Sequence, residues 1–200
     1  MMKHQHSSWR GLGKAIAAAM LGLFVAACST GDRQIITATT PVSFAQGTSI
    51  AVMPFDNLTS SEEAGQVASY LAVSALRANT TLAVQPESNV AQTYDSLNVQ
   101  GTASAAVGSH STVSARQLGE ILGVKYVLTG SVSEYGYQYG LREEPSVSMN
   151  MRLIDITTGA TVWSASSGIV GQGTFARDSV SIIAQRLVNQ MVANMTRTTN

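Results

Sequence analysis

Residue types that carry catalytic or metal chemistry are scarce in this chain, which has one cysteine and three histidines in 200 residues. A conventional zinc site needs three or four Cys, His or carboxylate ligands, and no calcium loop of the D-x-[DN]-x-[DN]-G type occurs. A serine hydrolase needs a histidine base, but His110 is the only histidine outside the first 27 residues and no G-x-S-x-G motif is present. The sequence therefore predicts no metal, no cofactor and no catalytic residue, and favours a protein that is not an enzyme.

A hydrophobic run long enough to cross a bilayer is also missing. The run from Ala15 to Ala27 has 13 residues, whereas a spanning helix needs about 20. Lys3, Arg10 and Lys14 precede this run, which is the order of charges typical of a secretory signal peptide. We therefore expect residues 1–27 to be removed.

Cysteine is absent from the rest of the chain, and the single Cys28 ends the sequence Val-Ala-Ala-Cys. These residues match the bacterial lipobox, in which the cysteine thiol receives a diacylglycerol and becomes the acylated N-terminus. The alternative is an ordinary signal peptide with an incidental thiol. Ser29 follows the cysteine, and the enterobacterial retention signal for the inner membrane is Asp at that place. The sequence therefore predicts a lipid anchor at Cys28 in the outer membrane, on its periplasmic face.

Charge is scarce as well, because charged residues make up 12% of the chain against about 25% in an average protein. Removal of residues 1–27 leaves nine basic residues against twelve acidic ones, a net charge of −3. A negative chain is not expected to bind nucleic acid. A weakly charged surface also repels its own copies weakly, which favours self-association.

The remaining sequence predicts one domain on a tether. Residues 28–48 are rich in Ser, Thr, Gly and Gln and predict a lipidated N-terminus followed by a flexible linker. Residues 49–197 predict an α/β domain, which is enough chain for one core. Within it, β-branched or helical periodicity predicts strands and helices in the following ranges: strands 49–55, 82–85, 124–139, 146–157 and 160–169, and helices 61–76, 90–97, 115–122 and 175–195.

This order of elements predicts a single mixed sheet packed with helices. The first helix permits a parallel crossover early in the chain, and the tight turn at Thr158-Gly159 requires antiparallel hairpins late in the chain. We expect Asp56-Asn57 to form a turn and Ser114 to cap the helix that ends before Gly123. Asp155, just before the hairpin turn, is expected to accept hydrogen bonds from its backbone.

Three aromatic residues and one charged turn are candidates for binding. Tyr135, Tyr137 and Tyr139 alternate along one strand and should share a face, either packed under a helix or presented to a partner. Trp163 is a core residue or an anchor that contacts the membrane or a partner. The turn at 140–145 contains Arg142, Glu143 and Glu144, and forms a solvated hairpin tip or a subunit contact.

Three segments resemble the CsgG-like superfamily of periplasmic lipoproteins. They are IAVMPFDN at 50–57, LGEILGVKYVLTGSV at 118–132 and RLIDITTG at 152–159, the last followed by VWS at 162–164. Within the superfamily, YGLREEP at 139–145 and ARDS at 176–179 are most similar to the Pel exopolysaccharide export lipoproteins. The resemblance implies a CsgG/TolB-N-like mixed sheet. It also adds Arg177 and Asp178 to the candidate subunit contacts.

The resemblance implies a non-catalytic role in the cell envelope. Export lipoproteins of the Pel type form a homo-oligomeric ring at the outer membrane and guide an exopolysaccharide to a porin, so a ring and a porin or export complex are the expected partners. The alternative is a monomeric activator of a peptidoglycan synthase, as in the LpoB group. A third possibility, a protein that binds a small ligand or glycan, requires a concave pocket with converging polar groups.

Overall fold

The computed structural model describes residues 33–102, 113–139, 143–171 and 178–196. Within these ranges, seven strands form one mixed sheet in which six follow the order β1-β7-β6-β5-β2-β4, while β3 pairs with β5. The strands are β1 (Arg33–Ala38), β2 (Ser49–Val52), β3 (Asp56–Asn57), β4 (Ala83–Val84), β5 (Tyr126–Tyr139), β6 (Glu143–Asp155) and β7 (Thr161–Val170). The helices are α2 (Ala64–Asn79), α3 (Glu87–Thr102), α4 (Ala115–Leu122) and α5 (Val180–Thr196).

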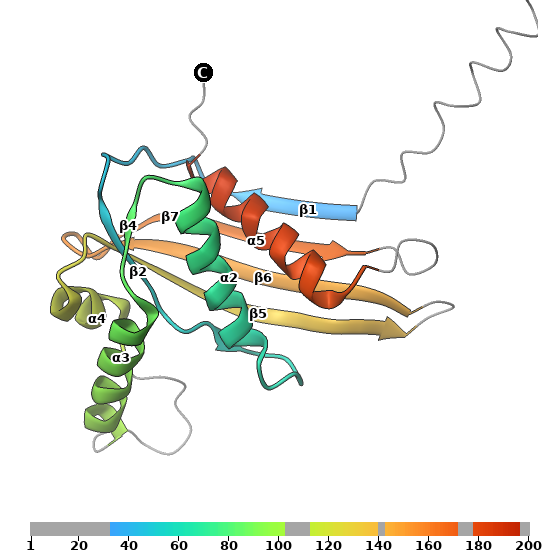
Figure 1. The fold of residues 1–200 in the computed structure, drawn as a ribbon, viewed down its shortest axis with the longest axis horizontal. Helices are drawn as coiled ribbons and strands as arrows, with labels where there is room; N and C mark the ends of the chain where they lie inside the picture. Colours follow the sequence, from blue (N-terminus) through green and yellow to red (C-terminus); the bar gives the residue numbers. More distant parts are fainter. Residues whose placement is uncertain (1–32, 103–112, 140–142, 172–177, 197–200) are drawn as a thin grey trace, which may run out of the picture. The chain divides into compact units, whose positions relative to one another are not determined.

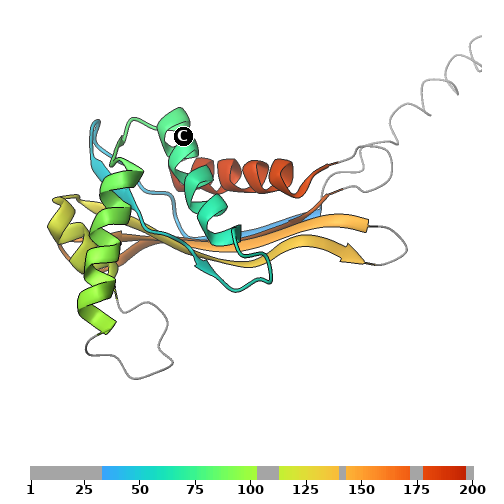
Figure 2. The same cartoon turned by 60° about the horizontal axis from the view of Figure 1, so that its bottom comes forward.

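The sheet has a parallel part and an antiparallel part, as the sequence predicts. Strand β2 pairs in parallel with both β4 and β5, and β5, β6, β7 and β1 pair antiparallel in turn. Figures 1 and 2 show α2 and α5 together on one face of the sheet, with α3 and α4 beside β2 and the start of β5. The predicted fold class, a single mixed sheet packed with helices, is confirmed.

Alternation along the strands creates two cores. Residues Ile50 and Val52 of β2 join a large cluster with α2 and α5, whereas Ala51 and Met53 join a smaller cluster with α3 and α4. Successive side chains of a strand point to opposite faces, so β2 is buried on both sides. The parallel part of the sheet is therefore covered by helices on two faces.

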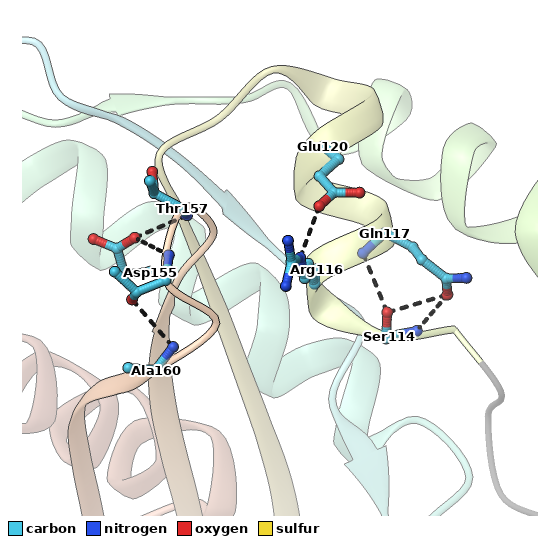
Figure 3. A network of polar contacts seen from close by, with 8 residues as sticks. Ser114, Arg116, Gln117, Glu120, Asp155, Thr157 and Ala160 are labelled. Carbon is cyan, nitrogen blue, oxygen red and sulfur yellow. Dashed lines mark hydrogen bonds and ion pairs between the residues drawn. The ribbon is translucent and has the colours of Figure 1, made fainter.

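Helix α4 has the boundaries that the sequence predicts. The Ser114 hydroxyl accepts a hydrogen bond from the Gln117 backbone N–H (3.2 Å), and the Gln117 side chain accepts one from the Ser114 N–H (3.3 Å), which completes a capping box (Figure 3). Gly123 ends the helix in a left-handed conformation with φ 64°. A side chain at this φ would be strained, and glycine avoids that cost.

The antiparallel hairpin of β6 and β7 is confirmed, but its loop is longer than the tight turn predicted at Thr158-Gly159, since β6 ends at Asp155 and β7 begins at Thr161. The Asp155 carboxylate accepts hydrogen bonds from the backbone N–H groups of Thr157 (2.9 Å) and Thr158 (3.1 Å), as expected from its place before a turn (Figure 3). Gly159 has φ 71°, and the Asp155 N–H donates to the Ala160 carbonyl at 3.0 Å. Asp155 therefore acts as a turn residue.

The prediction of a flexible linker over residues 28–48 is wrong for its described part. Residues Arg33–Ala38 form β1, paired antiparallel along β7 from Arg33↔Val170 to Ala38↔Ala165. Beyond the strand, Val42 and Phe44 pack against the larger core, and the Phe44 ring meets Tyr126 edge-on with centroids 5.5 Å apart. Pairing with a strand distant in sequence orders this segment, whose short β-branched run Ile35–Thr37 suits a strand.

Three local predictions also need correction. Asp56–Asn57 form the short strand β3, paired in parallel with Ser131 and Val132 of β5, instead of a free turn. The helix predicted at 61–76 is observed as α2 over Ala64–Asn79, and it begins after Glu63, whose side chain makes no capping hydrogen bond. Helix α3 runs over Glu87–Thr102 and is twice as long as the predicted helix at 90–97.

Candidate functional site

A β-bulge decides which way the predicted tyrosine stripe faces. Before the bulge, Val132 lies opposite Met149; after it, Glu134 lies opposite Ser148 and Tyr135 opposite Val147. The extra residue, Ser133, exchanges the two faces of β5, because side chains alternate along a strand. Tyr135 and Tyr137 thereby share the face of the buried Val147, as predicted, whereas the side chain of Tyr139 lies outside the part that the structure describes.

The tyrosines differ in how far the helices cover them. Tyr135 is half-buried and packs against the larger core, whereas Tyr137 is 47% exposed. Tyr135 is therefore a packing residue, and Tyr137 is available to a partner.

Trp163 is not a contact residue. Its side chain is 1% exposed and belongs to the core beneath α2 and α5. The alternative that it anchors the protein to a membrane or partner is wrong. Side chains alternate along β7, and Trp163, the register partner of Leu153, lies on the face that the helices cover. The core alternative is the one that the structure confirms.

The predicted charged contacts are only partly described. Glu143 is exposed and Glu144 half-buried where β6 begins. Asp178, ahead of α5, makes an ion pair with Arg186 at 3.6 Å. Arg142 and Arg177 lie outside the described residues, as do Cys28 and His110, so their roles remain predictions.

A deep surface crevice lies between α2 and α3, at the ends of β2 and β4. Its cavity volume is 610 Å³, and its walls come from the segment after β2, from α2 and from the first turns of α3. Val52, Phe55, Val73 and Val90 line it with apolar side chains, each at most 5% exposed. This is the concave pocket that the third sequence interpretation requires. Sequence reasoning missed it because its walls are far apart in the chain.

Acidic and aromatic side chains surround the crevice. Glu62, Glu87 and Asp95 supply carboxylates, and Tyr70 and Tyr94 supply rings. Arg77 contacts Glu87 through Nη1–Oε1, at 3.0 Å. A hydrogen bond from its own backbone N–H is the main cause that holds the pKa of Glu87 below its ordinary value. Burial opposes this effect, and the hydrogen bond and the charge of Arg77 lower the pKa further. Glu87 is therefore ionised and paired at neutral pH.

A second surface, the polar face, lies on the antiparallel strands opposite α2 and α5. Register places Ser131 of β5 opposite Asn150 of β6, and Asn150 opposite Ser166 of β7. The Asn150 amide donates a hydrogen bond to the Ser131 hydroxyl at 2.6 Å, and Ser148 donates to Glu134 at 3.3 Å. These side chains bond to one another, so this part of the polar face is a preformed hydrogen-bond network.

Within the described ranges, no group of three or more His, Cys, Asp or Glu side chains is placed to hold a metal ion. None of the helices in those ranges combines the length and the hydropathy needed to cross a membrane. The crevice and the hollows of the polar face are two of the concave surface sites within the described residues.

Solved structures with this fold include two bacterial proteins of similar size. The PelC dodecamer from Paraburkholderia phytofirmans is 25% identical, with a TM-score of 0.62, and the match covers 82% of this chain and 99% of that chain. Lipoprotein GNA1162 from Neisseria meningitidis is 26% identical, with a TM-score of 0.51, over 72% of this chain and 98% of that chain. No curated protein matches the sequence.

These structures confirm the resemblance to periplasmic lipoproteins predicted from the strand and hairpin segments. The family model described as GNA1162-like matches residues 40–200. This range contains β2 through α5, and therefore both cores and the crevice. The chain belongs to the GNA1162-like lipoprotein family.

Proposed function

We propose that the protein is an outer-membrane lipoprotein, anchored through acylated Cys28, that acts without catalysis as an oligomeric component of an envelope export apparatus. An exported exopolysaccharide is the proposed cargo, and an outer-membrane porin or export complex is the proposed partner. The observation that carries the proposal is the shared fold with PelC, which assembles as a dodecamer and whose chain is covered almost completely by the match.

Two features of this chain support self-association. Its charged residues make up only 12% of the sequence, so its copies repel weakly. A ring also needs two different complementary surfaces on each subunit, and the exposed polar face and the β5–β6 end of the sheet lie on different parts of the domain. Arg142, Glu143, Glu144, Arg177 and Asp178 are the proposed contacts between subunits.

The mass of the full acylated chain in a mild detergent tests the proposal. We expect light scattering, corrected for detergent, to give one closed oligomer whose mass does not change with concentration. Arg142→Glu and Arg177→Glu should each shift the population toward monomer. Arg116→Glu makes the same charge change in an exposed pair on α4 and should leave the mass unchanged.

A monomer at all concentrations would contradict the ring and favour the activator of a peptidoglycan synthase. The cargo needs a cellular test. Cells that lack the protein should retain the exopolysaccharide in the periplasm, and the wild-type gene should restore its appearance on the surface. Normal export in the deletion strain would contradict the export role.

A further inference from the structure

The crevice occupies a topological switch point of the sheet. Strand β2 continues into α2, which packs on the larger core, and the neighbouring β4 continues into α3, which packs on the smaller core of the opposite face. When two adjacent parallel strands connect to helices on opposite faces of a sheet, a gap opens outside the carboxyl ends of the strands. Ligands of α/β proteins bind in such gaps. The 610 Å³ cavity lies at this gap, lined by residues that follow β2 and β4.

The floor of the crevice is apolar and its mouth keeps apolar surface exposed. Val52, Phe55 and Val90 supply the floor without a polar side-chain atom. Tyr70, on the α2 wall, is 51% exposed. An exposed aromatic ring at a concave site with an apolar floor is typical of a surface that a partner covers.

The rim of the crevice is negative. The described residues that line it include Glu62, Glu87 and Asp95 but no Lys, Arg or His. Arg77 neutralises Glu87, while Glu62 and Asp95 are exposed. Charge complementarity therefore favours a cationic occupant.

The positions of the exposed carboxylates and the apolar floor define that occupant further. Glu62 comes from the segment just before α2 and Asp95 from α3. An occupant with more than one cationic group can therefore pair with both walls of the crevice. Sugar hydroxyls would find no hydrogen-bond partner on the floor, and their burial there would be unfavourable. Apolar side chains of a peptide suit the floor.

We propose that the crevice binds a basic amphipathic segment of a partner protein, with apolar side chains on the floor and Lys or Arg at the acidic rim. This inference rests on the proposed function, since an assembly component needs a surface for its partner besides those for its own copies. Helix-in-groove recognition uses apolar anchors at i and i+4 in this way.

A fluorescent peptide of twelve residues, with two leucines four positions apart, lysines beside them and alanine elsewhere, tests the proposal. Its binding to the full acylated chain in zwitterionic nanodiscs is measured by anisotropy, with empty nanodiscs as blank. The Glu62→Gln/Asp95→Gln variant should bind about threefold to tenfold more weakly. Tyr70→Ser should weaken binding about tenfold. A peptide with glutamate in place of lysine should not bind.

Matched controls separate the crevice from general attraction to a negative protein. Glu120→Gln/Glu134→Gln removes the same charge from other surfaces, and Tyr137→Ser removes a tyrosine of similar exposure (47%); both should bind the peptide like the wild type. Equal binding by crevice and control variants, or no binding by the wild type, would overturn the proposal. A third outcome is that a glucosamine hexamer binds through Glu62 and Asp95 while the peptide does not bind. In that case the occupant of the crevice is a glycan and the peptide proposal is overturned.

The same samples distinguish this inference from the proposed function. If the wild type is an oligomer but the crevice variants bind the peptide unchanged, the ring stands and the crevice proposal fails. If the wild type is a monomer and the crevice variants lose the peptide, the ring fails while the crevice remains a binding site.

Discussion

The guanidinium of Arg77 contacts both carboxylate oxygens of Glu87, with Nη1–Oε1 and Nη2–Oε2 distances of 3.0 Å each. Arg77 lies in the last turn of α2 and Glu87 in the first turn of α3, so this pair joins two helices that cover opposite faces of the sheet. Both side chains are partly exposed (46% and 38%), which limits the energy of the pair through solvent screening.

Arg77→Gln should therefore lower the free energy of unfolding at pH 7 by about 0.2 to 1 kcal/mol. The pKa of Glu87 is lowered in the folded state, so its contribution is present above the pKa of the unfolded chain and is lost as the pH falls through the folded pKa. Urea unfolding at pH 7 and pH 3 checks this. A difference between wild type and variant that is as large at pH 3 as at pH 7 would contradict it.

Gly65→Ala should destabilise the fold by about 1 to 3 kcal/mol through overpacking. A Cβ at Gly65 would overlap the backbone carbonyl oxygen of Phe55, and this cost exceeds the gain of about 1 kcal/mol in helix propensity. The control is Gly136→Ala, where a Cβ meets nothing within 4 Å. Denaturant midpoints should fall for the first variant and stay level or rise for the second.

Trp163 is the only tryptophan outside residues 1–27, so the fluorescence of the processed protein reports its burial. We expect blue-shifted emission that acrylamide and brominated lipids quench weakly. Trp163→Ala should cost about 3 to 5 kcal/mol of stability. Strong quenching by brominated lipids would show instead that the side chain reaches the membrane.

Cys28→Ser should abolish lipidation and move the protein out of the outer-membrane fraction. Metabolic labelling with an alkyne fatty acid, followed by membrane fractionation, measures both effects. Ser29→Asp is the companion change, because the enterobacterial sorting rule then predicts retention at the inner membrane. Labelled Cys28→Ser protein would place the lipid on another residue.

Local signals explain where prediction from the sequence succeeded. Helix α4 begins and ends at residues whose types favour a helix terminus. Ser114 and Gln117 form the capping box at its start, and Gly123 takes the left-handed conformation at its end. β1 carries only a short β-branched run, Ile35–Thr37, within a stretch rich in Ser, Thr, Gly and Gln, and it becomes a strand by pairing with β7. Sequence alternation also predicted the shared face of the tyrosines, but the bulge at Ser133, visible only in the register, decides which face it is.

The crevice could not be predicted for a different reason. Val52, Tyr70 and Tyr94 come from three segments, and each has an ordinary explanation as a strand or helix residue when considered alone. Only the crossing of α2 and α3 to opposite faces of the sheet brings them to one site.

The early start of β1 would limit how far the domain can lie from a lipid on Cys28. Between Cys28 and Arg33, the first residue of β1, the chain can extend by at most about 18 Å. A linker lasting to residue 48 would have reached about 70 Å on the same basis. A lipid on Cys28 would thus hold the β1 edge of the sheet close to the bilayer, within that shorter reach, and give every anchored copy a similar height above the membrane.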